Sequence, residues 1–242
     1  MAMPSIELVA LAVLLIIFSA VSLWKKALDL KGVIVALIVG ILTYFFGGAS
    51  AFIALIVFFI VGEFATRLAR SRYKKEHETR SIGNILGNAL APLIALIAGW
   101  NFGFFAGVSA ALADTLSSEI GLLSKSKPRM ITTLKEVEPG IDGGVTLLGL
   151  IASFAGAIII GIVFWIVGPW PNGIIDPMLI GIIIVAGFLG SIIDSLLGAT
   201  LQKRKLLDNN SVNFMAITVT IIIAMIMVSL YIIWLFSNSF SL

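Results

Sequence analysis

A short acidic motif lies in one of the most apolar parts of the chain. Residues 113–121 read ADTLSSEIG and follow the run FGFFAGVSAAL. A carboxylate inside a membrane costs about 2.5–3.5 kcal/mol even on lenient insertion scales, so it usually marks a functional site. At about 100° per residue in a helix, Asp114, Ser117 and Ser118 share one face. Glu119 lies on its flank. This face must look into a bundle or a hydrated cavity, because lipid cannot satisfy it.

A second aspartate repeats this motif eighty positions later. GVSAALADTLSS (107–118) aligns with GFLGSIIDSLLG (187–198), and both read G-x6-D-[ST]-L. Two such helices could place Asp114 and Asp194 at related depths, facing one another across a shared interior. A pair of hard carboxylates, together with phosphate oxygens and water, is what Mg²⁺ prefers. The repeat therefore favours a shared metal site. The alternative is that each aspartate lies solvated or ion-paired at a helix end.

Asparagines form two further polar clusters. SIGNILGNALAP (81–92) places two asparagines four residues apart, each after a glycine that permits close backbone approach. Simple helix–helix contact explains this stretch equally well. LDNNSVNF (207–214) enters the last apolar run, and Asp208 or the next residue could cap that helix. One cap needs only one such residue, so the others are expected to line a cavity. The asparagines assigned to this cavity are Asn84, Asn88, Asn209, Asn210 and Asn213.

The longest predicted polar connection, KSKPRMITTLKEVEPGIDGGVT (125–146), combines basic residues, hydroxyls and a glycine-rich turn. Glycines before a helix start expose backbone N–H groups where the helix dipole is positive, which suits an anion. The spacings G-x4-G-K-[ST] and G-x-G-x-x-G are absent, so neither nucleotide fingerprint applies, and a plain turn is the alternative. The loop residues expected to contact phosphate are Arg129, Thr132, Thr133, Lys135, Pro139, Gly140, Asp142, Gly143 and Gly144.

The composition indicates a membrane protein. Of 242 residues, 60% are hydrophobic and only 12% are charged, too few charges for the surface of a soluble domain. There is no cysteine, which excludes disulfides and Cys-based metal sites. We expect an all-α polytopic fold in which the first span is retained, since no small-residue cleavage signature follows it. The eight predicted spans are 5–23, 32–46, 49–66, 83–99, 102–122, 145–167, 178–200 and 212–236.

The basic residues predict the orientation of these spans. All 16 lysines and arginines fall in alternate connections, which the positive-inside rule places in the cytoplasm. Both termini are then outside, and the polar clusters lie at the cytoplasmic face, where excess positive charge attracts anionic lipids and phosphorylated substrates. We expect one integral-membrane domain over 1–242 in the plasma membrane of a prokaryote. Its N-terminal spans occupy 1–80, and its catalytic core occupies 81–242 around the cytoplasmic loop 124–144.

Five motifs, in order, resemble the domain-of-unknown-function 92 family. They are GN-x2-GN, ADTLSSEIG, PRMITTLKEVEPGIDGGVTLLG, GFLGSIIDSLLGATLQ and DNNSVNF. The resemblance is close over about residues 80–215 and general over the first three spans. That membrane family includes transmembrane protein 19 and the plant phytyl-phosphate kinase of vitamin E synthesis.

The resemblance implies a kinase that transfers the γ-phosphate of CTP or another nucleoside triphosphate to an isoprenoid monophosphate, using Mg²⁺. It implies that Asp114 and Asp194 hold the metal, with Glu119 as a third acidic ligand or an orienting group. The loop hydroxyls, the catalytic cation Lys135 and the Pro139–Gly144 backbone would cradle the triphosphate. The asparagines, with Ser117 and Ser118, would position nucleotide or acceptor phosphate. The expected partners are these two substrates and membrane lipid, without nucleic acid, and a homo-oligomer is compatible with the sequence.

Two other functions stay open. In a lipid cytidylyltransferase the lipid phosphate attacks the α-phosphate of CTP and pyrophosphate leaves, and the same residues would serve. A secondary transporter is the other alternative, because an internal repeat with acids inside the membrane is common in carriers. The crowding of polar residues at one end of the spans favours an enzyme.

Overall fold

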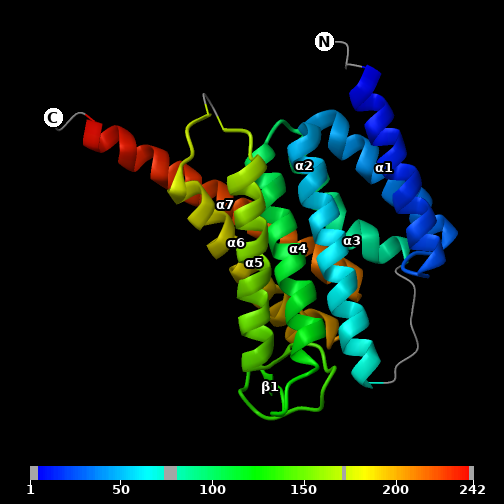
Figure 1. The fold of residues 1–242 in the computed structure, drawn as a ribbon. Helices are drawn as coiled ribbons and strands as arrows, with labels where there is room; N and C mark the ends of the chain where they lie inside the picture. Colours follow the sequence, from blue (N-terminus) through cyan, green and yellow to red (C-terminus); the bar gives the residue numbers. More distant parts are fainter. Residues whose placement is uncertain (1–4, 74–80, 171–172, 240–242) are drawn as a thin grey trace.

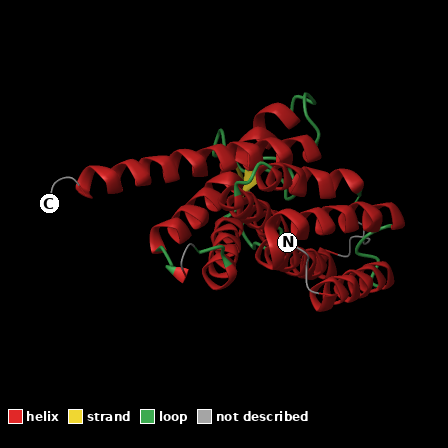
Figure 2. Ribbon diagram, turned by 90° about the horizontal axis from the view of Figure 1, so that it is seen from above, coloured by secondary structure: helices red, strands yellow, loops and turns green. Residues whose placement is uncertain are grey.

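The computed structural model describes residues 5–73, 81–170 and 173–239, which form a bundle of helices (Figure 1). Seen from above, the helices surround a central core and α7 extends away from it (Figure 2). Apart from one pair of two-residue strands, all regular elements in these ranges are helical, so the predicted all-α membrane fold is confirmed. The elements are α1 (Ser5–Trp24), α2 (Leu30–Tyr73), α3 (Ile82–Ile97), α4 (Asn101–Gly121), β1 (Arg129–Met130), β2 (Gly144–Val145), α5 (Leu147–Val167), α6 (Pro177–Leu197), the π-helical turn η2 (Gly198–Gln202) and α7 (Asn209–Ser239).

Helix α2 contains two of the predicted spans. Gly48, between them, has φ 65° and ψ −163°, a conformation that glycine adopts at little cost, and α2 bends back near its midpoint (Figure 1). The eight predicted spans therefore correspond to seven described helices. α3 has 16 residues and continues through Pro92 as one helix.

Helix α4 is the centre of the bundle. It packs against α2, α3, α5, α6 and α7, and residues 103–113 within it are all buried. A helix enclosed by protein needs no apolar outer face, which explains how α4 can carry the acidic motif. Of the described helices, α1, α2, α5, α6 with η2, and α7 are long and apolar enough to cross a membrane.

Small residues let α5 and α6 approach α4 closely. A Cβ built on Gly156 of α5 would lie 3.1 Å from the Ala113 Cα atom, and one on Gly190 of α6 would lie 2.6 Å from the Ala110 Cβ atom. The hydroxyl of Ser109 donates to the Ile183 carbonyl at 3.2 Å. These contacts fix α4 against α6 and so set the distance between the aspartates one turn further along.

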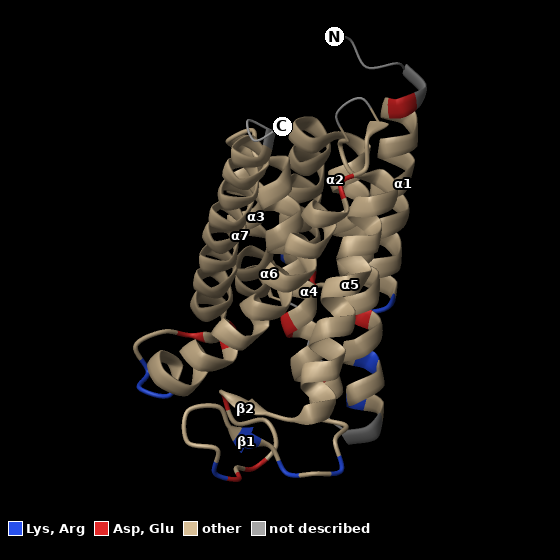
Figure 3. Ribbon diagram, turned by 90° about the vertical axis from the view of Figure 1, so that its left-hand side faces the viewer, with Lys and Arg blue, Asp and Glu red and all other residues tan. Residues whose placement is uncertain are grey.

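The two ends of the bundle differ in their content of charged residues. The described lysines and arginines lie toward the end that carries β1, β2 and the connection from η2 to α7 (Figure 3). We call this the basic end. The opposite end of the core is aromatic: Phe105 and Phe164 pack with ring centroids 4.9 Å apart, and Phe164 and Trp170 with centroids 4.6 Å apart.

Candidate functional site

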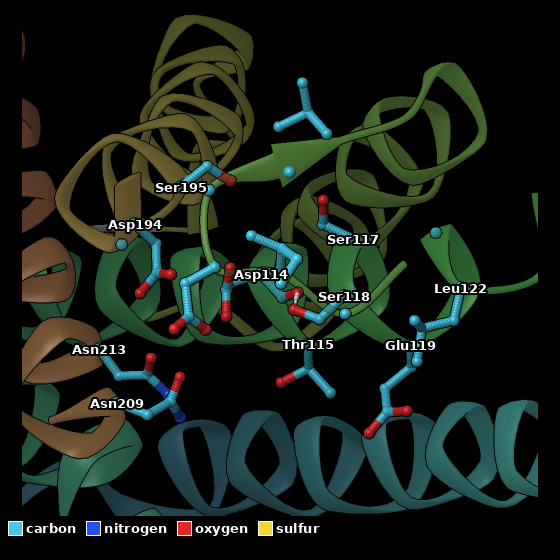
Figure 4. A pocket seen from close by; sticks show the side chains of 18 of the residues that line it. Asp114, Thr115, Ser117, Ser118, Glu119, Leu122, Asp194, Ser195, Asn209 and Asn213 are labelled. Carbon is cyan, nitrogen blue, oxygen red and sulfur yellow. Dashed lines mark hydrogen bonds between the residues drawn. The ribbon is translucent and has the colours of Figure 1, made fainter. Parts of the chain in front are cut away.

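A polar cavity of about 310 Å³ lies at the basic end, between the helices and the loop that carries β1 and β2 (Figure 4). Its walls come from α2, α3, α4, α6, η2, α7 and the loop. The polar side chains that line it are Thr66, Arg70, Asn84, Asn88, Asp114, Thr115, Ser117, Ser118, Glu119, Asp142, Thr146, Asp194, Ser195, Gln202, Asn209 and Asn213.

The structure brings Asp114 of α4 and Asp194 of α6 together. Their side chains point toward each other, and the carboxyl groups lie within hydrogen-bonding reach (Figure 4). Two carboxyl groups this close repel each other when both are ionised. They must therefore share a proton or have a cation between them. Among the described residues that line the cavity, Arg70 is the only basic one. Carboxylate oxygens are hard ligands of the kind that Mg²⁺ prefers, so the chemistry of this pair fits that ion.

An amide network holds Asp194 in place. With its amide oriented by its neighbours, Asn213 of α7 donates to Asp194 Oδ2 at 3.0 Å and to the Asn209 carbonyl at 3.0 Å. It accepts a hydrogen bond from Asn88 Nδ2 at 3.2 Å, and that nitrogen also donates to the Asn84 carbonyl at 2.9 Å. Asn88 and Asn213 are both 6% exposed, so these bonds are screened little by water. The network joins α3 and α7 to the carboxyl pair.

The glycines of the GN-x2-GN motif serve helix packing, and its asparagines line the cavity. A Cβ on Gly87 would lie 2.8 Å from the Asn210 carbonyl oxygen, and one on Gly83 would contact the Asn210 amide. Asn210 therefore packs at the contact of α3 with α7 and is outside the described lining of the cavity, and its predicted phosphate contact stays a prediction. Helix–helix contact therefore explains the two glycines of the motif, and the lining of a cavity explains its two asparagines.

Asp208 caps α7, as one of the two sequence alternatives proposed. The Ser211 backbone N–H donates to Asp208 Oδ1 at 2.8 Å. Hydrogen bonds from the side chain and backbone of Ser211 hold the pKa of Asp208 below its usual value. The cap leaves Asn209 and Asn213 free of that task, and both lie on the cavity wall.

Glu119 lies on another wall of the cavity. Thr66 Oγ1 of α2 donates to Glu119 Oε1 at 2.9 Å, and Figure 4 shows this side chain well apart from Asp114 and Asp194. It is five positions after Asp114, which rotates it by about 140° around the helix. In the described part of the chain, no three Asp, Glu or His side chains gather into a metal-binding group. The arrangement thus does not support Glu119 as a third ligand, and an orienting role stays a prediction.

The glycine-rich segment 140–144 forms the cavity wall nearest the basic end. β1 pairs antiparallel with β2, and the Ile131 N–H donates to the Gly143 carbonyl at 2.9 Å. Gly143 has φ 77°, and a Cβ there would lie 2.7 Å from both the Cα and the N of Ala199 in η2. The loop therefore reaches η2 only because this residue is glycine. Loss of water around Asp142 raises the pKa of its carboxyl group, which lies close enough to Asp194 for their charges to interact.

Residues 132–136 of the same loop are exposed and lie outside the described lining of the cavity. The Met130 N–H donates to the Lys135 carbonyl at 2.9 Å, so the segment turns back on itself between these two residues. Arg129 lies 3.9 Å from Glu136 across this turn. Five residues predicted to contact phosphate are thus outside the described lining of the cavity. They are Arg129, Thr132, Thr133, Lys135 and Pro139.

Other lining residues were not predicted. Thr115 and Ser195 follow the two aspartates in the D-[ST]-L repeat, so the sequence did contain a signal for them. Thr66 and Arg70 come from the end of α2, and Gln202 comes from η2. No spacing in the sequence relates these three residues to the acidic motif, because tertiary packing alone brings them there.

Comparison with known proteins places the chain in a family. It matches the integral membrane protein DUF92 family over residues 13–221. A membrane protein of Methanocaldococcus jannaschii is 38% identical over 201 residues, which cover 79% of this chain and 82% of the relative. Protein PGR of Arabidopsis thaliana is 29% identical over 273 residues, covering 90% and 94%, and Protein VTE6, chloroplastic, of the same plant is 24% identical over 235 residues, covering 88% and 69%. No solved structure matches the chain. The chain belongs to the DUF92 family of integral membrane proteins.

Proposed function

We propose that this protein is a Mg²⁺-dependent kinase that transfers the γ-phosphate of a nucleoside triphosphate, with CTP a candidate donor, to an isoprenoid monophosphate. The observation that carries the proposal is the Asp114–Asp194 pair inside a polar cavity at the basic end of a membrane bundle. The sequence motifs add support, because they resemble a family that includes a phytyl-phosphate kinase, and VTE6 is among the relatives.

The reaction suits the side chains present. A lipid monophosphate oxygen is a competent nucleophile near neutral pH, so no strong base is needed. It attacks the γ-phosphorus, the bond from that phosphorus to the β-phosphate oxygen breaks, and the nucleoside diphosphate leaves with the bonding electrons. Catalysis of this step depends on alignment and on charge stabilisation. A cavity lined by carboxylates, amides and hydroxyls, with no histidine among its described lining residues, meets that requirement.

Three parts of the cavity wall have a role in this proposal. Asp114 and Asp194 would hold Mg²⁺, which supplies stabilisation of the negative charge that develops on the phosphate oxygens. Asn213 keeps Asp194 oriented through its amide. The backbone of segment 140–144 and the hydroxyl of Ser117 line the cavity, where they can donate hydrogen bonds to phosphate. The Ser118 hydroxyl also lines it, but donates to the Asp114 carbonyl at 2.8 Å. The basic end then faces the cytoplasm, where nucleoside triphosphates are supplied.

The opposite end of the bundle argues against transport. None of the residues that line the cavity comes from residues 101–113 of α4, and that half of the helix is buried among Phe105, Phe164 and other apolar side chains. A carrier needs access to its site from both faces of the membrane. The described lining of the cavity includes no residue from the opposite half of α4, which favours an enzyme over a carrier.

The test incubates purified protein in detergent with Mg²⁺, geranylgeranyl monophosphate and each nucleoside triphosphate in turn, with products identified by mass spectrometry. The proposal expects a lipid diphosphate and a nucleoside diphosphate. A nucleotidylated lipid with pyrophosphate would replace the kinase by a cytidylyltransferase. No product from any pair, with folded protein verified by circular dichroism, would refute the enzymatic proposal for this acceptor class.

A further inference from the structure

A second cavity adjoins the first on the other side of α3. It measures about 60 Å³ and lies between α1, both halves of α2, and α3. Its walls are formed by apolar side chains such as Leu15, Phe18 and Phe59, except where Asn84 and Asn88 line it. The same two asparagines line the polar cavity. The two cavities therefore meet at the asparagine face of α3, with ionic groups on one side and hydrocarbon on the other.

This juxtaposition suits an amphiphile with a charged end and a hydrocarbon chain. In a bilayer the surrounding lipid is as apolar as the cavity walls, so hydrophobic transfer contributes little to binding there. What such a cavity supplies is shape, which fixes the direction in which the chain leaves the charged group. Within the described residues, the side-chain amide of Asn84 makes no hydrogen bond, so it is available at the junction.

We propose that the apolar cavity holds the isoprenoid units nearest the phosphate of the acceptor, and that Asn84 positions that phosphate at the junction. This inference rests on the proposed kinase function, of which it defines the acceptor site. In this proposal α4 and α6 carry the carboxyl pair, while α1, α2 and α3 bind the hydrocarbon chain of the acceptor. The N-terminal helices are then part of the acceptor site.

The cavity can be narrowed without touching the polar side. Ala36 of α2 lines the apolar cavity, and Ala36→Leu adds three carbon atoms to it. Ala20→Leu makes the same change on α1, at an exposed position outside the described lining, and serves as the matched control. Gly40→Ala is a milder variant, because a Cβ there would meet Phe52 and Leu15 at the ordinary distances of 3.4 and 3.5 Å.

The first experiment measures kcat/KM with geranylgeranyl monophosphate and with the short acceptor methyl monophosphate, which has no isoprenoid unit to enter the apolar cavity. Ala36→Leu should lower the value for the long acceptor by about tenfold or more, the usual scale for a misfit in an apolar pocket. The value for the short acceptor should change far less, and Ala20→Leu should match the wild type with both. Equal changes for the two acceptors in Ala36→Leu would overturn the proposal. If that variant does not fold, Gly40→Ala gives the same comparison in weaker form.

The second experiment separates this inference from the kinase proposal. A geranylgeranyl monophosphate with a diazirine on its first isoprene unit is photolysed with the protein in detergent without nucleotide, and labelled peptides are mapped by mass spectrometry. Labelling of α1, α2 or α3 that Ala36→Leu abolishes supports the acceptor site, even if no phosphoryl transfer is found. Labelling confined to α5, α6 or α7 would refute it, even if the kinase reaction is confirmed.

Discussion

The contact between the glycine-rich loop and η2 can be tested with a single methyl group. In Gly143→Ala the new Cβ would lie 2.7 Å from the Cα and N of Ala199, and would also contact its Cβ. Two of these are backbone atoms, so rotation of a side chain cannot relieve the overlap. Gly143 also has φ 77°, where any other residue costs about 1–2 kcal/mol.

Gly140→Ala is the matched control for this change. Gly140 has φ 86°, so alanine carries the same conformational cost, but nothing lies within 4 Å of its Cβ position. We expect Gly140→Ala to lower the free energy of unfolding by about 1–2 kcal/mol at most and to leave turnover within a few-fold of the wild type. Gly143→Ala must in addition move the loop away from η2. A shift of about 1 Å in a positioning element can lower kcat by about 100-fold.

The assay compares kcat for phosphorylation of geranylgeranyl monophosphate in both variants, with thermal unfolding in detergent as the measure of stability. Gly143→Ala should lose far more activity than stability, relative to Gly140→Ala. Ala199→Gly, which removes one of the overlapping atoms, should restore part of that activity in the double variant. Equal losses in the two single variants would show that conformational strain alone is responsible, and that contact with η2 does not position the site.

The site supports four further predictions. Asp114→Asn and Asp194→Asn should each lower kcat by about 100-fold or more while circular dichroism stays unchanged, and near-normal turnover in either would contradict the shared metal site. Asn213→Ala removes the donor to Asp194 and one of the two acceptors of Asn88 Nδ2, which keeps the Asn84 carbonyl, so thermal unfolding should show a loss of about 1–3 kcal/mol. The lowered pKa of Asp208 means that its charged form stabilises the fold above the usual carboxyl pKa, and that this contribution is lost as the pH falls through the folded-state pKa. Asp208→Ala should therefore lower Tm at neutral pH, with the difference shrinking in acid, and a constant difference would rule out the charged cap. Lys135→Ala should raise KM by about fivefold at most, an effect that disappears at high salt, and a large loss of kcat would show direct contact instead.

The sequence predicted the parts of the site that lie on helices. Helical periodicity placed Asp114, Ser117 and Ser118 on one face, and the D-[ST]-L repeat correctly predicted that Asp194 would lie opposite Asp114. It also predicted the span boundaries to within three residues, because apolar length is set by the bilayer, except that α2 continues seven residues past the predicted end at 66. These features depend on local geometry that a regular helix repeats.

The sequence predicted the loop less well, because loop side chains have no fixed period. Lys135 and Thr132 share a segment with Gly143, yet a tight turn sends the first two into solvent and brings the third against η2. Arg70 is the reverse case: it was counted only among the loop cations, but the end of α2 places it on the cavity wall. Contacts between distant elements decide such positions, and one sequence does not record them.

The charged residues of this protein form two groups with different expected roles: exposed charges on the loop outside the cavity, and carboxyl groups inside it. Lys127 lies 3.4 Å from Glu138 and Arg129 3.9 Å from Glu136, and all four side chains are exposed, so these pairs are weak and hydrated. These two pairs carry no net charge. The surplus of lysines and arginines at the basic end produces a field that reaches about 8 Å at physiological ionic strength, far enough to attract an anionic substrate toward the cavity. Inside, acidic side chains outnumber the one basic lining residue, so the described cavity would repel a bare triphosphate. In the proposed mechanism, the outer cations therefore govern encounter with the substrate, while phosphate can occupy the cavity only together with a cation that neutralises the Asp114–Asp194 pair.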